Sequence, residues 1–336
     1  MKIHVILTGG TIGSRINDDG YIANNEASTF RIIDMYQKKY DCDCSFTASE
    51  PYNILSENLA AKYVIALYHE ILSVANSHPD GIIVTHGTDS LQYCSTLISY
   101  MCGHLNIPIV FVSSAYVLDD PRANGLINFD AAINFIKTKP DGGVYVSYKN
   151  ENDIPYIHIP TRLHAPQPFT ADISSIKNNW YACYQGKDII TNCKFMHTND
   201  NISSFGELLP EATLTLTHRS NVIRITPPYA GIRYPELTEK TKAVLLETYH
   251  SGTLRANTSL KEFTNKASEM NIPVYLTGLS DKATDYKTVS IYDKLGIIPL
   301  KDSSSVSQFC KLWIALSNNV NLNEIMHKSV AYDKVL

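Results

Sequence analysis

The amino-terminal stretch from Lys2 to Ser14 constrains the fold most, because a short apolar run passes directly into a glycine-rich turn. Residues 3–7 predict a buried strand. The turn after it alternates glycines with hydroxyl residues, namely Thr8, Gly9, Gly10, Thr11 and Gly13. Glycines let a backbone approach a ligand closely, and a hydroxyl on such a turn can serve as a nucleophile. The stretch therefore predicts a ligand site at the end of a first strand.

A second stretch repeats this arrangement later in the chain. The apolar run 81–84 ends in Thr85-His-Gly-Thr-Asp-Ser90, which supplies hydroxyls, a glycine and one carboxylate. Ligands of open parallel sheets bind at the carboxyl ends of the strands. We therefore expect the two stretches to face one pocket, with Thr88 and Asp89 near Thr11.

Strand and helix patterns alternate from residue 2 to about 149, which predicts a parallel sheet with helices on both faces. The predicted strands are 44–49, 109–113 and 143–148, and the predicted helices are 59–77, 91–101 and 123–137. The polar loop Ser14 to Asn25 follows a candidate nucleophile directly and predicts a lid.

The order weakens after Asn150, where prolines and Asn/Asp clusters predict a long excursion and then a linker. A second alternating region follows, with apolar runs at 221–225, 243–246 and 272–277 and helices at 260–270 and 304–316. A chain of 336 residues exceeds one ordinary core, so we expect two domains. The expected ranges are an α/β domain at 1–190, a linker at 191–218 and a smaller α/β domain at 219–336.

The composition favours small-molecule chemistry. The chain has 44% hydrophobic and 18% charged residues and a net charge of −4, which leaves no basic footprint for nucleic acid and no mark of a membrane partner. No apolar stretch approaches transmembrane length. Seven scattered cysteines and a strand that begins at residue 2 predict free thiols and a cytoplasmic location.

Several motifs have simpler structural interpretations. A Gly-Gly-Thr turn alone is more often a tight turn, and Thr88 with Asp89 could cap the next helix. The pattern Gly-x-Gly-x-x-Gly is absent, which disfavours a dinucleotide. Cys42-Asp-Cys44 could clip a metal and His86 could join a triad or a metal site, but neither has partner spacing, so packing is favoured for both.

The combination of motifs carries a family resemblance. Thr8-Gly-Gly-Thr-Ile-Gly13 together with Thr85-His-Gly-Thr-Asp89 resembles the two signatures of the bacterial-type L-asparaginase/glutaminase family. Gly20-Tyr-Ile22, Ser113 to Asn128 and Glu247 to Gly252 also resemble family blocks. The resemblance covers nearly the whole chain and is strongest to the cytoplasmic (type I) branch.

This resemblance implies a larger flavodoxin-like, doubly wound amino-terminal domain followed by a smaller α/β domain. It implies an amidohydrolase that forms an acyl-enzyme on Thr11, with Tyr21 of a mobile loop against that threonine and with catalytic roles for Thr88 and Asp89. The implied substrate-binding residues are Gly10, Ser56, Glu57, Gly87 and Ser114. It implies no cofactor, a small amino-acid amide as substrate, and a homotetramer built from close dimers.

Two positions depart from the family pattern. Thr161-Arg-Leu-His164 places Arg162 where the family carries a catalytic lysine. An arginine cannot serve as a neutral amine base, but it can still hold positive charge near Thr88 and Asp89. Lys149 is a weaker substitute. Thr253 stands where an asparagine is usual. These departures keep open a binding or sensing homologue with weak or lost catalysis, and an amidase for a modified asparagine-like or glutamine-like substrate.

Overall fold

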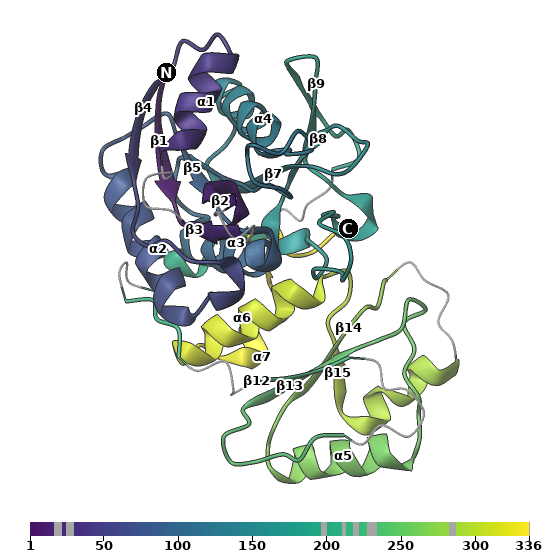
Figure 1. The fold of residues 1–336 in the computed structure, drawn as a ribbon. Helices are drawn as coiled ribbons and strands as arrows, with labels where there is room; N and C mark the ends of the chain where they lie inside the picture. Colours follow the sequence, from purple (N-terminus) through teal and green to yellow (C-terminus); the bar gives the residue numbers. More distant parts are fainter. Residues whose placement is uncertain are drawn as a thin grey trace.

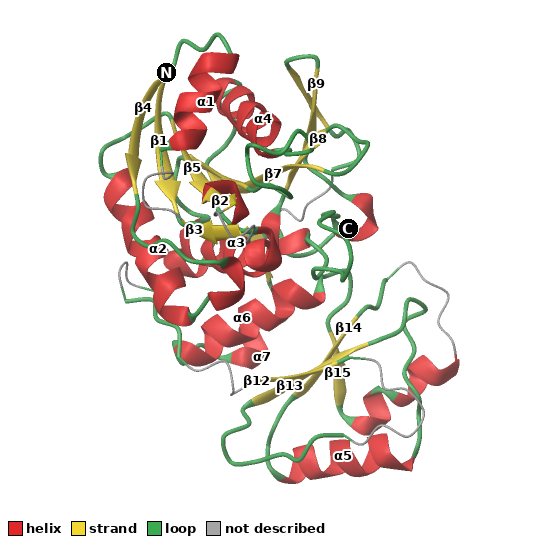
Figure 2. Cartoon of the chain, viewed as in Figure 1, coloured by secondary structure: helices red, strands yellow, loops and turns green. Residues whose placement is uncertain are grey.

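The computed structural model describes residues 1–16, 22–24, 30–195, 200–209, 213–217, 222–226, 234–281 and 287–335. Two mainly parallel sheets organise these residues, a large one near the amino terminus and a small one in the later part of the chain (Figure 1). Helices cover the faces of both sheets (Figure 2). The expected α/β class with a mostly parallel sheet is confirmed.

The large sheet has eight strands. In spatial order they are β4 (Ser45–Ser49), β1 (Lys2–Leu7), β5 (Gly81–Thr85), β6 (Pro108–Val112), β7 (Gly143–Lys149), β8 (Pro155–His158), β9 (Ala182–Gln185) and β10 (Asp188–Thr191). The first five are parallel, and their sequence order of 2-1-3-4-5 is the flavodoxin-like order. The last three strands add antiparallel pairs.

Alternate residues of the strands face opposite layers of helices. Val5 and Ile83 pack in the same core as α1 (Arg31–Lys39) and α4 (Gly125–Lys137). Ile6 and Val84 point to the other face, because successive side chains of a strand alternate. That second face is covered by α2 (Ala61–Ala75), α3 (Leu91–Cys102) and α6 (Ser305–Ser317).

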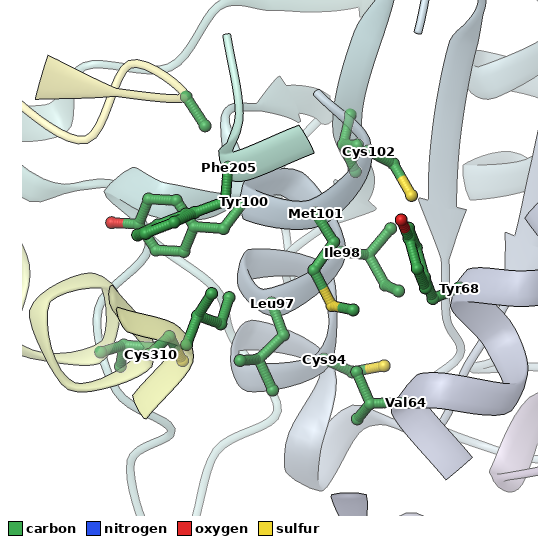
Figure 3. Close-up of a cluster of buried hydrophobic side chains, with 14 of the residues drawn as sticks. Val64, Tyr68, Cys94, Leu97, Ile98, Tyr100, Met101, Cys102, Phe205 and Cys310 are labelled. Carbon is green, nitrogen blue, oxygen red and sulfur yellow. The ribbon is translucent and has the colours of Figure 1, made fainter. Parts of the chain in front are cut away.

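Helix α3 is the most deeply buried helix of this layer, since eleven of its twelve residues are buried. Figure 3 shows Val64 and Tyr68 of α2 on one side of α3 and Cys310 of α6 on the other. A helix surrounded in this way has apolar or small side chains all round, which explains the weak amphipathic pattern of 91–102.

The small sheet holds four parallel strands: β12 (Val222–Ile225), β13 (Ala243–Glu247), β14 (Val274–Thr277) and β15 (Ile297–Pro299). One face packs on α5 (Thr258–Glu269), with Val244 and Leu246 pointing to it. The opposite face, including Ala243 and Leu245, shares a core with α6. Helix α6 therefore lies between the small sheet and α3.

The carboxyl-terminal segment returns to the large sheet, and the C terminus lies beside it in Figure 1. Its elements are α7 (Leu322–Ile325) and β16 (Ser329–Val330), and β16 pairs with β11 (Asn201–Ile202). Val330 and Ala331 join the same core as α3. The expected range of 219–336 assigns this segment to the second domain, and the segment contacts both α6 of that range and β11 and α3 of the earlier part of the chain.

A buried ion pair fixes this segment. Lys311 of α6 and Asp333 are both fully buried, with Nζ and Oδ2 2.9 Å apart. The Tyr100 hydroxyl donates to the same carboxylate oxygen at 2.9 Å, and the Val330 N–H donates to the other at 3.1 Å. The carboxylate thus joins α3, α6 and the chain end.

The region after Lys149 differs from the expected irregular excursion, because β8, β9 and β10 extend the large sheet there. Prolines and turn residues concealed strands of only four residues each. Within the range of the expected lid, 14–25, strand β2 (Ser14–Ile16) pairs antiparallel with strand β3 (Ile22–Asn24).

We predict that Asp333→Asn lowers the free energy of unfolding by about 3 kcal/mol, because it leaves the Lys311 ammonium buried without its counter-charge. Urea unfolding measures this loss. The control is Asp281→Asn, which breaks the exposed pair with Lys301 and should change the free energy by less than about 1 kcal/mol. Equal losses of unfolding free energy in both variants would contradict a stabilising role for the buried pair of Lys311 and Asp333.

Candidate functional site

The site lies where the strand order of the large sheet reverses. The chain passes from β1 to β4 on one side of β1, and β5 pairs with the opposite side. Leu7 and Thr85 are register partners at the carboxyl ends of β1 and β5. Ligands of doubly wound sheets bind outside the strand ends at such a switch point. The loops after Leu7 and Thr85 are the two glycine-rich motifs.

Three loops touch at this point: the loop after β1 with Gly10, the loop after β5 with Gly87, and the loop that holds Ile54 and Ser56. Their contacts leave no room for side chains at the two glycines. A Cβ added to Gly10 would lie 2.4 Å from Cα of Gly87, and one added to Gly87 would lie 2.5 Å from Cβ of Ser56. The Gly10 N–H also donates to the carbonyl of Ile54 at 2.8 Å. Gly10 has a φ of +75°, which a side chain would strain. The contact therefore requires both glycines.

The hydroxyls of the first motif have different surroundings. Thr8 Oγ1 donates to the carbonyl of Thr85 at 2.7 Å, and Ser14 Oγ donates to the carbonyl of Gly10 at 2.8 Å. Thr11 is half-buried at the start of a 3-10 turn, and its hydroxyl makes no hydrogen bond within the described part of the chain. Thr11 is therefore the hydroxyl of this motif that is available to a ligand.

The second motif forms a 3-10 turn, Thr88–Ser90, directly before α3. Ser56 Oγ donates to Asp89 Oδ2 at 3.2 Å, and Ser90 Oγ donates to the carbonyl of Ser56 at 2.7 Å. The residue that precedes α3 is Ser90, without a side-chain cap bond, so Thr88 and Asp89 do not cap the helix. Asp89 is exposed at the rim and can meet a ligand.

The remaining substrate-binding candidates differ in whether their side chains are accessible to a ligand. Glu57 is exposed on the short turn Ser56–Asn58, beside Ser56. Ser114 follows β6, is fully buried, donates to the carbonyl of Tyr116 at 2.6 Å and accepts from the Gly125 N–H at 3.1 Å. Its hydroxyl is occupied within the fold. Tyr21 lies outside the described residues.

Arg162 does not lie where the sequence motif suggested. Its side chain is fully buried; Nε donates to the carbonyl of Tyr332 at 2.7 Å and Nη2 to that of Lys334 at 2.9 Å. Nη1 donates to Asn179, and the guanidinium carbon lies 4.5 Å from the ring centroid of Phe195. Burial lowers the pKa of Arg162 to about 10.

The expectation that Arg162 holds its charge near Thr88 and Asp89 is therefore wrong for the described contacts, none of which joins it to either residue. Because Arg162 is fully buried, its guanidinium needs acceptors, and the carbonyls of Tyr332 and Lys334 and the side chain of Asn179 supply them. Lys149 does not replace it, since its Nζ reaches only the carbonyl of Asn150, at 3.4 Å, and it lines a separate cavity with Arg122.

A cavity of about 830 Å³ opens beside Ser56 and Asp89. It extends between α2, α3, α6 and β12, and its apolar wall is formed by Leu59, Ala61, Val64, Leu97, Phe309 and Trp313. Arg224 also lines it and is bound by Glu247, Tyr93 and Ser305. The sequence analysis did not predict this cavity. The one signal was Arg224 inside the apolar run 222–225, because an arginine there needs a polar partner.

Other classes of site find no support among the residues that the structure describes. Within those ranges no group of three or more His, Cys, Asp or Glu side chains could hold a metal ion. None of the described helices is long and apolar enough to cross a membrane. His86 is buried, and its Nδ1 donates to the carbonyl of Gly87 at 2.8 Å, so it has the packing role that we favoured.

Comparison with known proteins gives a consistent picture. Residues 2–170 match the family described as "Asparaginase, N-terminal". The chain is 25% identical over 341 residues to an L-asparaginase of Thermococcus kodakarensis, covering 98% of both chains. It is 23% identical to a glutamyl-tRNA(Gln) amidotransferase component of Metallosphaera sedula, covering 96% of this chain and 74% of the relative.

Solved structures show the same fold. The thermostable L-asparaginase from Thermococcus kodakarensis matches with a TM-score of 0.73 and 21% identity, covering 100% of both chains. L-asparaginase I from Vibrio cholerae matches with a TM-score of 0.75 and 20% identity, covering 100% of this chain and 99% of that one. At these identities the likeness concerns the arrangement of the chain.

We predict that Arg162→Lys lowers stability, because a lysine cannot reproduce donation to Tyr332, Lys334 and Asn179 from one planar group. The expected loss is about 2 kcal/mol in urea unfolding, from several charged hydrogen bonds. Arg122→Lys, at an exposed position, is the control. A rise in amide turnover without loss of stability would instead return Arg162 to the site.

We predict that His86 weakens the fold in acid. Burial lowers the pKa of His86 from 6.5 to about 4. Between these values the unfolded chain binds a proton that the folded chain does not, so stability falls as the pH drops from 6.5 to 4, by about 3 kcal/mol in all. Urea unfolding at pH 7.5 and pH 4.5 should show a smaller drop in His86→Gln; an unchanged drop would contradict this.

Proposed function

Because the chain belongs to the asparaginase family, we propose that it is an amidohydrolase of the L-asparaginase type. It hydrolyses the side-chain amide of L-asparagine or a related amide to the acid and ammonia. The observation that carries the proposal is the Thr11 hydroxyl, which makes no hydrogen bond among the described residues and stands on a turn touching the Thr88 turn through Gly10 and Gly87.

In the proposed reaction Thr11 Oγ attacks the amide carbon and forms a C–O bond. The C–N bond then breaks, and the amide nitrogen leaves as ammonia with the proton that came from the hydroxyl. Water attacks the resulting ester, which releases the acid and restores the hydroxyl. Backbone N–H groups of the Thr88 turn supply donors for the oxyanion, because such groups are fixed before the reaction.

The substrate is held at the rim. The exposed carboxylate of Asp89 attracts the α-ammonium, and Ser56 binds the α-carboxylate from the same side. Gly10 and Gly87 let the substrate approach the backbone, and Glu57 adds a second carboxylate beside Ser56. Tyr21 remains our proposal for the group that sits against Thr11.

A second candidate function follows from Arg162. Its guanidinium binds the chain end, so the family's lysine has no replacement there that contacts Thr88 or Asp89 among the described residues. A binding or sensing homologue would keep the grip of Asp89 and Ser56 without efficient turnover. Thermal stabilisation by asparagine or aspartate without ammonia release would favour this function.

The names of the relatives are relevant to whether this chain acts alone, with copies of itself or with other subunits. Several relatives are named as parts of a glutamyl-tRNA(Gln) amidotransferase, which describes those proteins as components of a larger enzyme. For this chain we propose a cytoplasmic homo-oligomer, a dimer or tetramer, acting on a small amide. Elution at several times the 37.5 kDa monomer mass would support it.

We predict that Thr11→Ala lowers the kcat of ammonia release from L-asparagine by at least about a thousandfold, because it removes only the nucleophilic hydroxyl and a methyl group. Circular dichroism should show an unchanged fold. Thr191→Ala, at an exposed position on β10 of the same sheet, is the control and should keep full activity. Retained activity in Thr11→Ala would move the nucleophile to Thr88 or Thr8.

A further inference from the structure

The large apolar cavity beside the site is a place for part of the substrate. It has a volume of about 830 Å³, within the range of sites for small organic ligands. Free asparagine, held at the rim by Asp89 and Ser56, leaves this space unused. Ser56 and Asp89 line both the rim and the cavity, whereas Thr11 and Thr88 do not line the cavity.

This placement sets the direction in which a substrate extends. With its amide at Thr11 and its ammonium at Asp89, a substrate presents its α-carbon to Ser56, where the cavity begins. A substituent on the α-carboxyl group then enters the cavity, while a substituent on the side-chain amide points towards the nucleophile. The cavity therefore fits an extension at the α-carboxyl end.

The charges of the wall define the chemistry of that extension. The carboxylates Asp89 and Glu57 stand at the mouth and favour a free ammonium. Among the described residues that line the cavity, Arg224 is the one arginine or lysine, and Glu247 already neutralises it with Tyr93 and Ser305 as further partners. An anionic extension would find no unpaired cation among these described residues, which favours an uncharged extension.

The rest of the wall is aliphatic and aromatic. Leu59, Val64 and Leu97 form one side, and the rings of Phe309 and Trp313, with centroids 6.2 Å apart, form the other. Trp313 is held in place because its Nε1 donates to the carbonyl of Thr217 at 2.7 Å. A wall of this kind binds an apolar side chain by removing it from water.

We propose that the preferred substrate is an asparagine whose α-carboxyl group carries an apolar substituent, as in the amino-terminal asparagine of a peptide with an apolar second residue. This rests on the proposed function. Thr11 attacks the side-chain amide, the C–N bond of that amide breaks, ammonia leaves, and water hydrolyses the ester to give the aspartyl peptide. The peptide bond stays intact.

The test compares L-asparaginyl-L-leucine N-methylamide with L-asparaginyl-glycine N-methylamide and free asparagine. In these compounds only the side-chain amide can release ammonia, and mass spectrometry identifies the aspartyl product. We expect kcat/KM for the leucine compound to exceed both others at least about tenfold, since burial of one leucine side chain is worth about that factor or more.

Ala61→Phe fills the cavity from the first residue of α2 and should lower the ratio of the leucine compound to asparagine at least about tenfold. Ser73→Phe, exposed on the same helix, is the matched control and should leave the ratio unchanged. Calorimetry with Thr11→Ala adds a measurement independent of turnover: the leucine compound should bind at least about tenfold more tightly than asparagine.

The outcomes distinguish the substrate preference from the proposed function. Turnover of asparagine without preference for the leucine compound overturns this inference and leaves the proposed function standing. No turnover of any compound overturns the proposed function, and calorimetry then decides whether the cavity binds the extension. Equal ratios in Ala61→Phe and Ser73→Phe would also overturn the inference.

Discussion

The close contact of Gly10 with Gly87, and of Gly87 with Ser56, is the constraint on which the site depends. Any side chain at either glycine would overlap backbone or Ser56 by a wide margin, so this approach of the loops needs glycine at both positions. Because these loops follow β1 and β5, the sheet fixes their separation and the glycines fix their approach. The contact thus places the turn of Thr11, our proposed nucleophile, against the turn that carries Asp89.

A second constraint lies behind the site, where α6 joins both parts of the molecule. This helix packs on α3 with one face and on the small sheet with another, so Lys311 is completely enclosed. Asp333 and Arg162 then fix the chain end against the same layer through buried charged groups. The wall of the large cavity is built from α3, α6 and β12, so its shape depends on this packing.

The sequence predicted those strands and helices whose apolar residues follow a simple periodic or continuous pattern. Strands such as β5 and helices such as α4 lie within two residues of their predicted bounds, since β5 is a continuous apolar run and α4 is long enough to show a helical pattern. The strands after Lys149 were missed because antiparallel strands of four residues leave too little pattern. The sequence predicted only that the two motifs face one pocket. The direct contact of Gly10 with Gly87 is visible only in the structure.

Arg162 shows where matching of residue types fails. Arg162 follows Thr161 at the position where the family carries a lysine, but a long side chain can reach in more than one direction, and the sequence does not say which. Here the carbonyls of Tyr332 and Lys334 accept from the guanidinium, because a buried donor without a partner is costly. The positive charge then lies at the chain end. Asp89 and Glu57 face the rim without it, and in our proposal this excess of negative charge selects substrates that keep a free ammonium.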